Sequence, residues 1–331
     1  MAFNSFRLSL LIPVYNDWEA VSLLLRMLDD VFDRVAVRAS VLLVDDGSTA
    51  KVSQQLRTAR FRNIESVQIL SLRRNLGHQR AITIALAFLA DRVKPDAVVV
   101  MDGDGEDSPN DVPRLIQRLA ELEGTRIVFA SRERRSESLV FRFFYSLYRY
   151  SHLALTGIPV RVGNFSIVPY DLLDRLVAVS ELWNHYAAAV FKSRMPRDSI
   201  PTERAPRLAG KPQMNFVSLV GHGLSALSVH AEVIGVRMLV LTSILVACVI
   251  GLLAAVVGIR FFSQLAIPGW ATTAGGLLFL VAMQAAVLAV FFVFLVLHGR
   301  SQPAFVPIRD YSYFVRGEET LFRRAYEISA V

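Results

Sequence analysis

The chain has 331 residues, a formal net charge of +7 and a hydrophobic content of 53%. Its one cysteine, Cys248, excludes an intrachain disulfide and a cysteine-based zinc site. The basic residues do not interleave with an aromatic RNA- or DNA-binding motif, so we expect no nucleic-acid partner and expect the basic flanks to meet anionic lipid.

Short apolar segments alternate with helical patterns through the first 130 residues. The apolar segments, rich in Val, Leu and Ile, are 8–13, 40–44, 67–72, 97–101 and 126–130, and the helical patterns are 17–32, 50–60, 79–92 and 111–122. This alternation predicts a doubly wound α/β sheet. Ligands of such sheets bind beyond the carboxyl ends of the strands, so the residues after each strand are the candidates for a site.

Polar or acidic residues follow each of the first four predicted strands, in PVYND (13–17), DDGST (45–49), RRNLGHQRA (73–81) and DGDGED (102–107). Asp102 and Asp104 can approach one divalent cation together with substrate phosphates. Bound Mg²⁺ or Mn²⁺ would neutralise charge on a departing nucleotide diphosphate. An Asp-x-Asp is common on surface loops, but its place after a buried strand favours the metal site.

The loops after the second and third strands offer groups for a nucleotide. Asp45 and Asp46, with Ser48 nearby, can accept hydrogen bonds from a base or a ribose. An ordinary turn capped by an aspartate is the alternative. Asn75 and Gly77 lie where a loop can contact the nucleotide, although this stretch equally suits the solvated start of a helix.

A helical pattern after the fifth strand carries an aromatic stripe and a few polar residues. Arg142 and Ser146 are four residues apart, which places both near one helical face. A guanidinium suits a phosphate, and the aromatic stripe suits lipid or the bilayer boundary. A solvated basic face is the alternative.

Two runs without Asp, Glu, Lys or Arg occupy residues 238–259 and 270–297. Each exceeds the about 20 residues that cross a hydrocarbon core of about 30 Å, whereas a buried helix of a soluble core is the alternative. We therefore expect a catalytic domain (1–211), a juxtamembrane interfacial helix (212–237), transmembrane helices (238–259 and 270–298) and a tail (299–331).

The expected location is the inner, cytoplasmic membrane, with two membrane spans. The N-terminus lacks a signal-peptide cleavage site, and the tail carries five arginines while the loop between the spans is nearly uncharged. This asymmetry predicts that the catalytic domain and both termini are cytoplasmic.

The motifs LLIPVYND, LLVDDGST, RRNLGHQRAI and VVVMDGDGEDSPND, joined to two C-terminal spans, resemble the inverting GT-A glycosyltransferases of family 2, in the branch that makes polyprenyl-phosphate sugars. The resemblance implies that Pro13, Tyr15, Asp17, Asp45 and Asp46 contact the nucleotide, that Asp102, Asp104 and Glu106 surround the metal, and that Arg132, Arg142 and Ser146 hold the lipid phosphate.

The same resemblance implies a membrane enzyme that transfers a sugar from a nucleotide sugar, with UDP favoured, to undecaprenyl or another polyprenyl phosphate. The product would donate sugar for envelope glycan modification. The acceptor phosphate is already an anion and needs no strong general base, so Asp104, Arg132 and Arg142 are the expected catalytic residues. Another lipid acceptor or a non-catalytic nucleotide-sugar-binding scaffold are the alternatives, and a homo-oligomer is left open.

Two departures from the family pattern leave the sugar unassigned. Asn164 stands where a carboxylate is common, and Arg161 adds positive charge, which suggests pairing with an acidic sugar; a plain surface arginine is the alternative. Residues 185–212, rich in Arg and Pro, predict a mobile loop that covers the donor, with a simple linker as the alternative.

Overall fold

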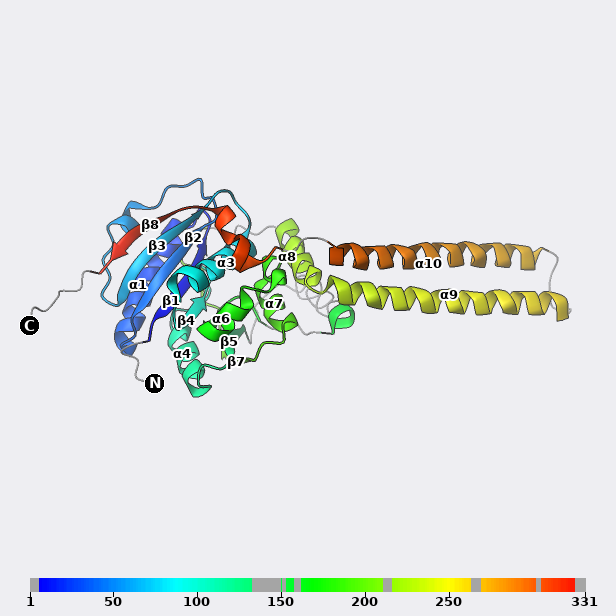
Figure 1. Cartoon of the computed structure of the whole chain (residues 1–331), viewed down its shortest axis with the longest axis horizontal. Helices are drawn as coiled ribbons and strands as arrows, with labels where there is room; N and C mark the ends of the chain where they lie inside the picture. Colours follow the sequence, from blue (N-terminus) through cyan, green and yellow to red (C-terminus); the bar gives the residue numbers. More distant parts are fainter. Residues whose placement is uncertain are drawn as a thin grey trace, which may run out of the picture. The chain divides into compact units, whose positions relative to one another are not determined.

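The computed structural model (Figure 1) describes residues 6–132, 150, 153–157, 162–210, 216–262, 269–301 and 305–324. The chain divides into two compact units. The first, which we call the sheet unit, comprises residues 1–145, 160–229 and 304–331. The second, the hairpin unit, comprises residues 146–159 and 230–303.

The sheet unit is built on one mixed sheet of eight strands in the order β7-β5-β6-β4-β1-β2-β3-β8. The strands are β1 (Leu8–Val14), β2 (Ala39–Asp45), β3 (Ile64–Leu72), β4 (Ala97–Val100), β5 (Ile127–Arg132), β6 (Ser166–Pro169), β7 (Arg197–Thr202) and β8 (Val315–Arg323). β1 to β4 are parallel, whereas β6 and β8 run antiparallel to their neighbours. The five predicted strands are confirmed.

Helices cover both faces of this sheet and bury its central strands. Because successive side chains of a strand point to opposite faces, Leu10 and Ile12 join one apolar cluster while Leu11 joins the other. The first cluster includes α1 (Trp18–Val35), α2 (Gln54–Arg57) and α4 (Asp111–Glu121), and the second α3 (His78–Phe88), α6 (Tyr170–Leu176) and α7 (Tyr186–Lys192). The predicted doubly wound α/β class is therefore confirmed.

Two sequence predictions need correction. The helix expected over residues 50–60 is the four-residue α2, which Ser53 caps by accepting a hydrogen bond from the Leu56 N–H at 3.2 Å. Within the loop expected over residues 185–212, α7 occupies Tyr186–Lys192 and β7 occupies Arg197–Thr202, while residues 203–210 contain no helix or strand. Tyr186 is fully buried, and β7 pairs with β5, so packing and sheet hydrogen bonds order this stretch despite its polar composition.

The tail returns to the sheet, which the sequence analysis did not predict. After α11 (Pro307–Asp310) and a 3₁₀ turn over Tyr311–Phe314, β8 runs antiparallel along the outer edge of β3. The ring of Phe305 lies 4.0 Å from that of Trp183, and Phe314 lies 5.1 Å from it, which anchors the segment before the strand. β8 thereby covers a β3 edge that would otherwise expose unpaired backbone groups.

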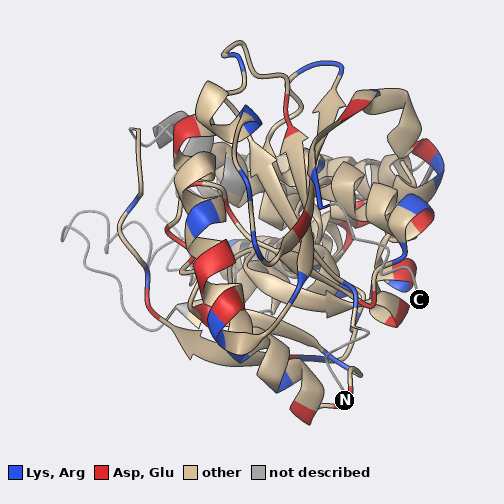
Figure 2. Ribbon diagram, turned by 90° about the vertical axis from the view of Figure 1, so that its left-hand side faces the viewer, with Lys and Arg blue, Asp and Glu red and all other residues tan. Residues whose placement is uncertain are grey.

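Basic and acidic residues are interspersed on the side of the molecule shown in Figure 2, and neither sign forms a large face of its own there. Several of these charges are paired in the sheet unit, for example Arg118 with Asp198 at 2.7 Å. Charge recognition in this unit must therefore arise from particular clusters of residues.

Two long helices, α9 (Ala231–Phe262) and α10 (Trp270–Ser301), form the hairpin unit and pack side by side (Figure 1). Gly235 permits their close approach, because a Cβ there would lie 2.5 Å from a methyl group of Val296. Both helices are long and apolar enough to cross a membrane. Only 11% and 6% of the residues in their most apolar stretches are buried, unlike the core helix of a soluble protein. α8 (Phe216–Ser228) precedes them in the chain and belongs to the sheet unit.

Candidate active site

The candidate site lies where the four parallel strands end. β4, β1, β2 and β3 are neighbours in the sheet and run in the same direction, so their carboxyl ends share one edge. Among the predicted residues, Asp17, Asn75 and Asp102 follow these ends, and Asp45 is the last residue of β2. The fold therefore brings together four motifs that are separated by up to 85 residues in the sequence, from position 17 to position 102.

Asn16 joins the loop after β1 to the loop after β2. Its backbone has a φ of 57°, and its side-chain oxygen accepts hydrogen bonds from the N–H groups of Thr49 (2.9 Å) and Ala50 (2.8 Å). Its own N–H donates to the Ser48 hydroxyl at 2.9 Å, and the Ser48 N–H donates to Asp45 at 2.8 Å. Sequence analysis missed Asn16, although asparagine in a short polar turn is typical of this left-handed backbone.

Asp46 supports the loop that leads into α3. Its carboxylate accepts hydrogen bonds from the N–H groups of Leu76 (2.7 Å) and Gly77 (2.9 Å), and the residue is only 3% exposed. Burial raises the pKa of Asp46, and the two N–H groups oppose that rise. This geometry favours a supporting role over the predicted nucleotide contact.

The other predicted donor residues lie around these loops. Pro13 is buried within β1, whereas the Tyr15 side chain is 40% exposed just beyond its end. Asn75 is exposed on the loop before α3, and Gly77 is the N-cap of that helix, with a φ of 92°. Tyr15 and Asn75 are thus accessible to a ligand.

The turn after β4 concentrates acidic side chains. The Asp107 carboxylate accepts a hydrogen bond from the Asp102 N–H at 3.1 Å, and the Asp104 carboxylate accepts one from the Glu106 N–H at 3.0 Å. Gly105 has a φ of 83°, a conformation that side-chain-bearing residues rarely adopt. These contacts fix a tight acidic turn.

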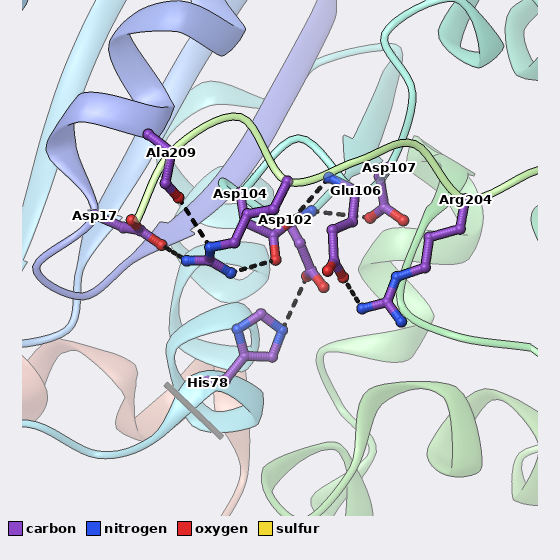
Figure 3. A network of polar contacts seen from close by, with 9 residues as sticks. Asp17, His78, Asp102, Asp104, Glu106, Asp107, Arg204 and Ala209 are labelled. Carbon is purple, nitrogen blue, oxygen red and sulfur yellow. Dashed lines mark hydrogen bonds and ion pairs between the residues drawn. The ribbon is translucent and has the colours of Figure 1, made fainter. Parts of the chain in front are cut away.

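Residues 203–210, which we call the arginine segment, lie across this turn (Figure 3). The Arg207 guanidinium donates to Asp104 at 2.9 Å and also to Asp17, so one cation joins the ends of β1 and β4. Arg204 pairs with Glu106. Sequence analysis did not single out these arginines, because their partners lie 98 to 190 positions away.

Backbone contacts also hold the arginine segment. The Leu208 N–H donates to the carbonyl of Asp104 at 2.9 Å, and the Ala205 N–H donates to that of Glu106 at 3.0 Å. A Cβ at Gly105 would lie 2.3 Å from the Leu208 side chain. A glycine is therefore needed both for the turn and for this close approach.

The Asp104 carboxylate lies among more negative than positive charge, even with the Arg207 guanidinium beside it. Burial raises the pKa of Asp104, and the carboxylates of Asp102 and Glu106 raise it further, while the Glu106 N–H and Arg207 act in the opposite direction. The Asp104 side chain is 17% exposed. A cation at this turn would relieve the repulsion between the carboxylates.

His78 lies against the acidic turn. Its Nε2 is 3.1 Å from a carboxylate oxygen of Asp102 and 3.0 Å from the side-chain nitrogen of Asn164. Burial alone lowers the pKa of His78, but the carboxylates of Asp102, Asp107 and Asp104 outweigh it and raise the pKa. His78 begins α3, as the helix-start alternative expected, and its ring contacts the acidic turn.

A buried polar network extends from Asn164. The Gln79 amide donates to the Asn164 side chain at 3.1 Å and accepts from the Tyr186 N–H at 2.7 Å. The Tyr186 hydroxyl lies 2.7 Å from the Ser166 hydroxyl, and burial raises the pKa of Tyr186. Asn164 is thereby fixed next to His78.

No three His, Cys, Asp or Glu side chains converge closely enough to hold a metal ion among the residues that the structure describes. Asp102 and Asp104 flank the turn, while the third predicted ligand, Glu106, pairs with Arg204. A cation at Asp102 and Asp104 would therefore compete with His78 and Arg207 for these carboxylates, and its further ligands would come from a substrate or from water.

The predicted acceptor residues are only partly within the described chain. Arg142, Ser146 and Arg161 lie outside the described residues. The backbone of Arg132 ends β5, at the same sheet edge as the acidic turn, but its side chain also lies outside the described part.

An acidic turn at the carboxyl edge of a doubly wound sheet is a typical position for an enzyme site. The glycosyl transferase family 2 domain matches residues 9–177, about half of the chain, and the chain belongs to this family. It is therefore a glycosyltransferase, as the motifs predicted.

Named relatives extend this comparison. The chain is 27% identical over 228 residues to the uncharacterized glycosyltransferase YkcC of Bacillus subtilis, covering 66% of this chain and 68% of that protein. It is 32% identical over 130 residues to an undecaprenyl-phosphate 4-deoxy-4-formamido-L-arabinose transferase of Edwardsiella ictaluri. That match covers 39% of this chain and 38% of the relative.

A similar solved structure is that of glucosyl-3-phosphoglycerate synthase from Mycobacterium tuberculosis. Its TM-score is 0.48 at 17% sequence identity, and the match covers 70% of this chain and 80% of that one.

Proposed function

We propose that this chain is an inverting membrane glycosyltransferase that moves a sugar from a nucleotide sugar, with UDP as the favoured nucleotide, to polyprenyl phosphate. The observation that carries the proposal is the acidic turn after β4, which faces the polar loops of three neighbouring strands in a family 2 domain. Similarity to undecaprenyl-phosphate sugar transferases supports this acceptor class.

The donor would lie along the shared strand edge. Asp45 and Ser48 offer polar groups to the base and ribose, and the exposed ring of Tyr15 offers a surface for stacking. Asp17 lies on the diphosphate side, because Arg207 joins it to Asp104 of the acidic turn. In this arrangement Arg207 can turn from the carboxylates to a phosphate, which its guanidinium also suits.

Asp102 and Asp104 fit a divalent cation by the chemistry of their donor atoms. Mg²⁺ is commonly bound through one or two carboxylates together with substrate phosphates and water, so a cluster of three protein ligands is not required. The raised pKa of Asp104 is consistent with a site that lacks positive charge. When bound, Mg²⁺ or Mn²⁺ would neutralise negative charge on the leaving diphosphate.

The acceptor phosphate would attack the anomeric carbon directly. It is already anionic near neutral pH, so the protein needs to position it and does not need a strong base. Arg132, Arg142 and Ser146 are the groups proposed to hold it. A single displacement inverts the anomeric centre, which yields a β-linked lipid-phosphate sugar from an α-linked donor, for use in envelope glycan modification.

The hairpin unit would place this chemistry at the inner membrane. α9 and α10 are both 32 residues long, or about 48 Å at a rise of about 1.5 Å per residue, which exceeds a hydrocarbon core of about 30 Å. The residues before α9 and the strand β8 after α10 belong to the same sheet unit. If both helices span the membrane, both ends of the hairpin must lie on the same side, because they connect to one folded unit. The arginines of the tail favour the cytoplasmic side.

A charge-removing variant tests the catalytic part of this proposal. Purified Asp104→Asn should transfer sugar to undecaprenyl phosphate at least about 100-fold more slowly than the wild type, because it loses the negative charge that would hold the cation where diphosphate charge develops. Asp174→Asn is the matched control, since Asp174 is exposed on α6, and it should retain activity. Equal rates for both variants would remove the acidic turn from the mechanism.

A further inference from the structure

A cavity of about 410 Å³ lies at the ends of β2, β3 and β8. Asp45 and Ser48 line it from the loop after β2, Arg73 and Arg74 from the end of β3, and Arg316 from the start of β8. Two of these residues were predicted to bind the donor nucleotide. Arg316 comes from the part of the chain that follows the hairpin, and no role has yet been assigned to it.

A β-bulge directs Arg316 to this position. Asp45 of β2 pairs with Ser71 of β3, which pairs with Gly317 of β8, so these three residues form one row across three strands. The next residue of β3, Leu72, pairs with Val315, which leaves Arg316 as the extra residue. Bulges re-aim side chains and are frequent beside active sites.

The short distance across the sheet puts Arg316 within reach of a ligand held by Asp45. Adjacent strands are about 4.8 Å apart, so the row from β2 to β8 spans about 10 Å. The β3 end between them is also fixed to the tail, because the Arg73 N–H donates to the carbonyl of Phe314 at 2.9 Å. The tail is thus part of the wall of this cavity.

The guanidinium groups of the cavity have no partner among the residues that the structure describes. Within the described chain, no hydrogen bond or ion pair involves the side chains of Arg73, Arg74 or Arg316. Some exposed arginines of the sheet unit do have carboxylate partners: Arg57, for example, pairs at 2.6 Å with Glu319 on the cavity rim. The guanidinium groups of the cavity are hydrogen-bond donors, and the Asp45 carboxylate beside them is an acceptor. Together they suit a ligand that has both acceptor and donor groups.

We propose that Arg316 selects the donor by its base: it donates a hydrogen bond to a base carbonyl oxygen while Asp45 accepts from the adjacent ring N–H. Uracil and guanine present a carbonyl next to a ring N–H. Cytosine presents an amino group next to an unprotonated ring nitrogen, so neither residue finds its partner. This inference rests on the proposed function and adds a specificity residue from the far side of the hairpin.

The test is a comparison of nucleotide affinities on the full-length protein in detergent with Mg²⁺. Calorimetry with UDP, GDP and CDP should show that the wild type binds UDP or GDP more tightly than CDP. Arg316→Ala should weaken the tighter nucleotide about tenfold, because a hydrogen bond to a charged group contributes about 1.5 kcal/mol or more, and it should leave CDP unchanged. Arg323→Ala is the matched control, because Arg323 is exposed at the other end of β8, opposite Ser66, and does not line the cavity.

The outcomes separate this inference from the proposed function. If the wild type discriminates against CDP and Arg316→Ala binds every nucleotide as the wild type does, Arg316 has no role in selection although the proposed function stands. Equal weakening of all three nucleotides, or a raised KM for polyprenyl phosphate alone, would also overturn the inference. A wild type that binds none of the three nucleotides would remove the proposed donor class itself.

Discussion

The ion pairs of Arg207 offer a direct test of how the acidic turn is held. Arg207→Met removes the charge but keeps most of the aliphatic stem, so packing changes little. The change leaves Asp17 and Asp104 facing each other without the guanidinium that joins them. We expect the variant to be less stable than the wild type in metal-free buffer.

The size of this loss follows from the exposure of the three side chains, which is 16% for Arg207, 19% for Asp17 and 17% for Asp104. Breaking a fully buried pair costs about 3–5 kcal/mol, whereas an exposed pair contributes about 0–1 kcal/mol. Partial solvation puts the loss between these limits, at about 1–2 kcal/mol. For a unit of this size that lowers Tm by about 2–8 °C.

Tryptophan fluorescence on heating is a suitable assay, because the Trp18 indole donates to the carbonyl of Ala50 at 3.1 Å, next to the site loops. Arg204→Met is the matched control: Arg204 is 46% exposed and, within the described chain, its ion pair is with Glu106, so its loss of about 0–1 kcal/mol should lower Tm by no more than about 4 °C. Mn²⁺ should raise the Tm of Arg207→Met more than that of the wild type, because the cation no longer competes with the guanidinium. Equal Mn²⁺ shifts in the two proteins would refute this reasoning.

Three further predictions concern the turns, the support of the loops and the acceptor. Gly105→Ala should lower both stability and activity, because the backbone there is left-handed and the added methyl group would collide with Leu208. Gly124→Ala is the control: Gly124 also has a left-handed φ of 69°, but no atom lies near the position of the added methyl group. This variant should lose only about 1 kcal/mol of stability in denaturation experiments. Asp46→Asn should lose about 1–2 kcal/mol, because an amide oxygen replaces a carboxylate that accepts from two N–H groups. Burial raises the folded-state pKa of Asp46 above its ordinary value of 3.8, so just above pH 3.8 the folded state binds more protons than the unfolded state. The stability of the wild type should therefore fall as the pH rises through this window. In Asp46→Asn, which has no carboxyl group to titrate there, Tm should depend less on pH over the same window. Arg142→Ala should raise the KM for polyprenyl phosphate with little change in that for the donor; a raised donor KM instead would contradict the acceptor role.

The central strands and the acidic turn could be predicted from the sequence because their signals are local. β1 and β4 are buried on both faces, so β4 is a continuous apolar run and β1 is one apart from Ser9. Asp102 and Asp104 follow β4 directly, and the parallel order of the strands places them beside the loops after β1 and β2. Position along a strand was sufficient to locate the edge of the sheet where the site lies.

The arginine segment and β8 could not be predicted in the same way. Arg207 meets Asp17 across 190 positions of sequence, and nothing in either local pattern indicates the pairing. β8 is mostly exposed and contains Gly317 and three charged residues in its first five positions, so it has no apolar alternation to mark a strand. Its place is set by pairing with the β3 edge, which only the folded sheet presents.

The most direct test of the central claim is the mass of the lipid product. Full-length protein in detergent would be incubated with undecaprenyl phosphate, Mg²⁺ or Mn²⁺, and a panel of UDP- and GDP-sugars, and the lipid fraction would be weighed by mass spectrometry. We expect one new species, equal to the lipid phosphate plus one sugar unit, to form with one donor and to be absent with Asp104→Asn. Unchanged lipid with every donor, while the protein still binds nucleotide, would contradict polyprenyl phosphate as the acceptor.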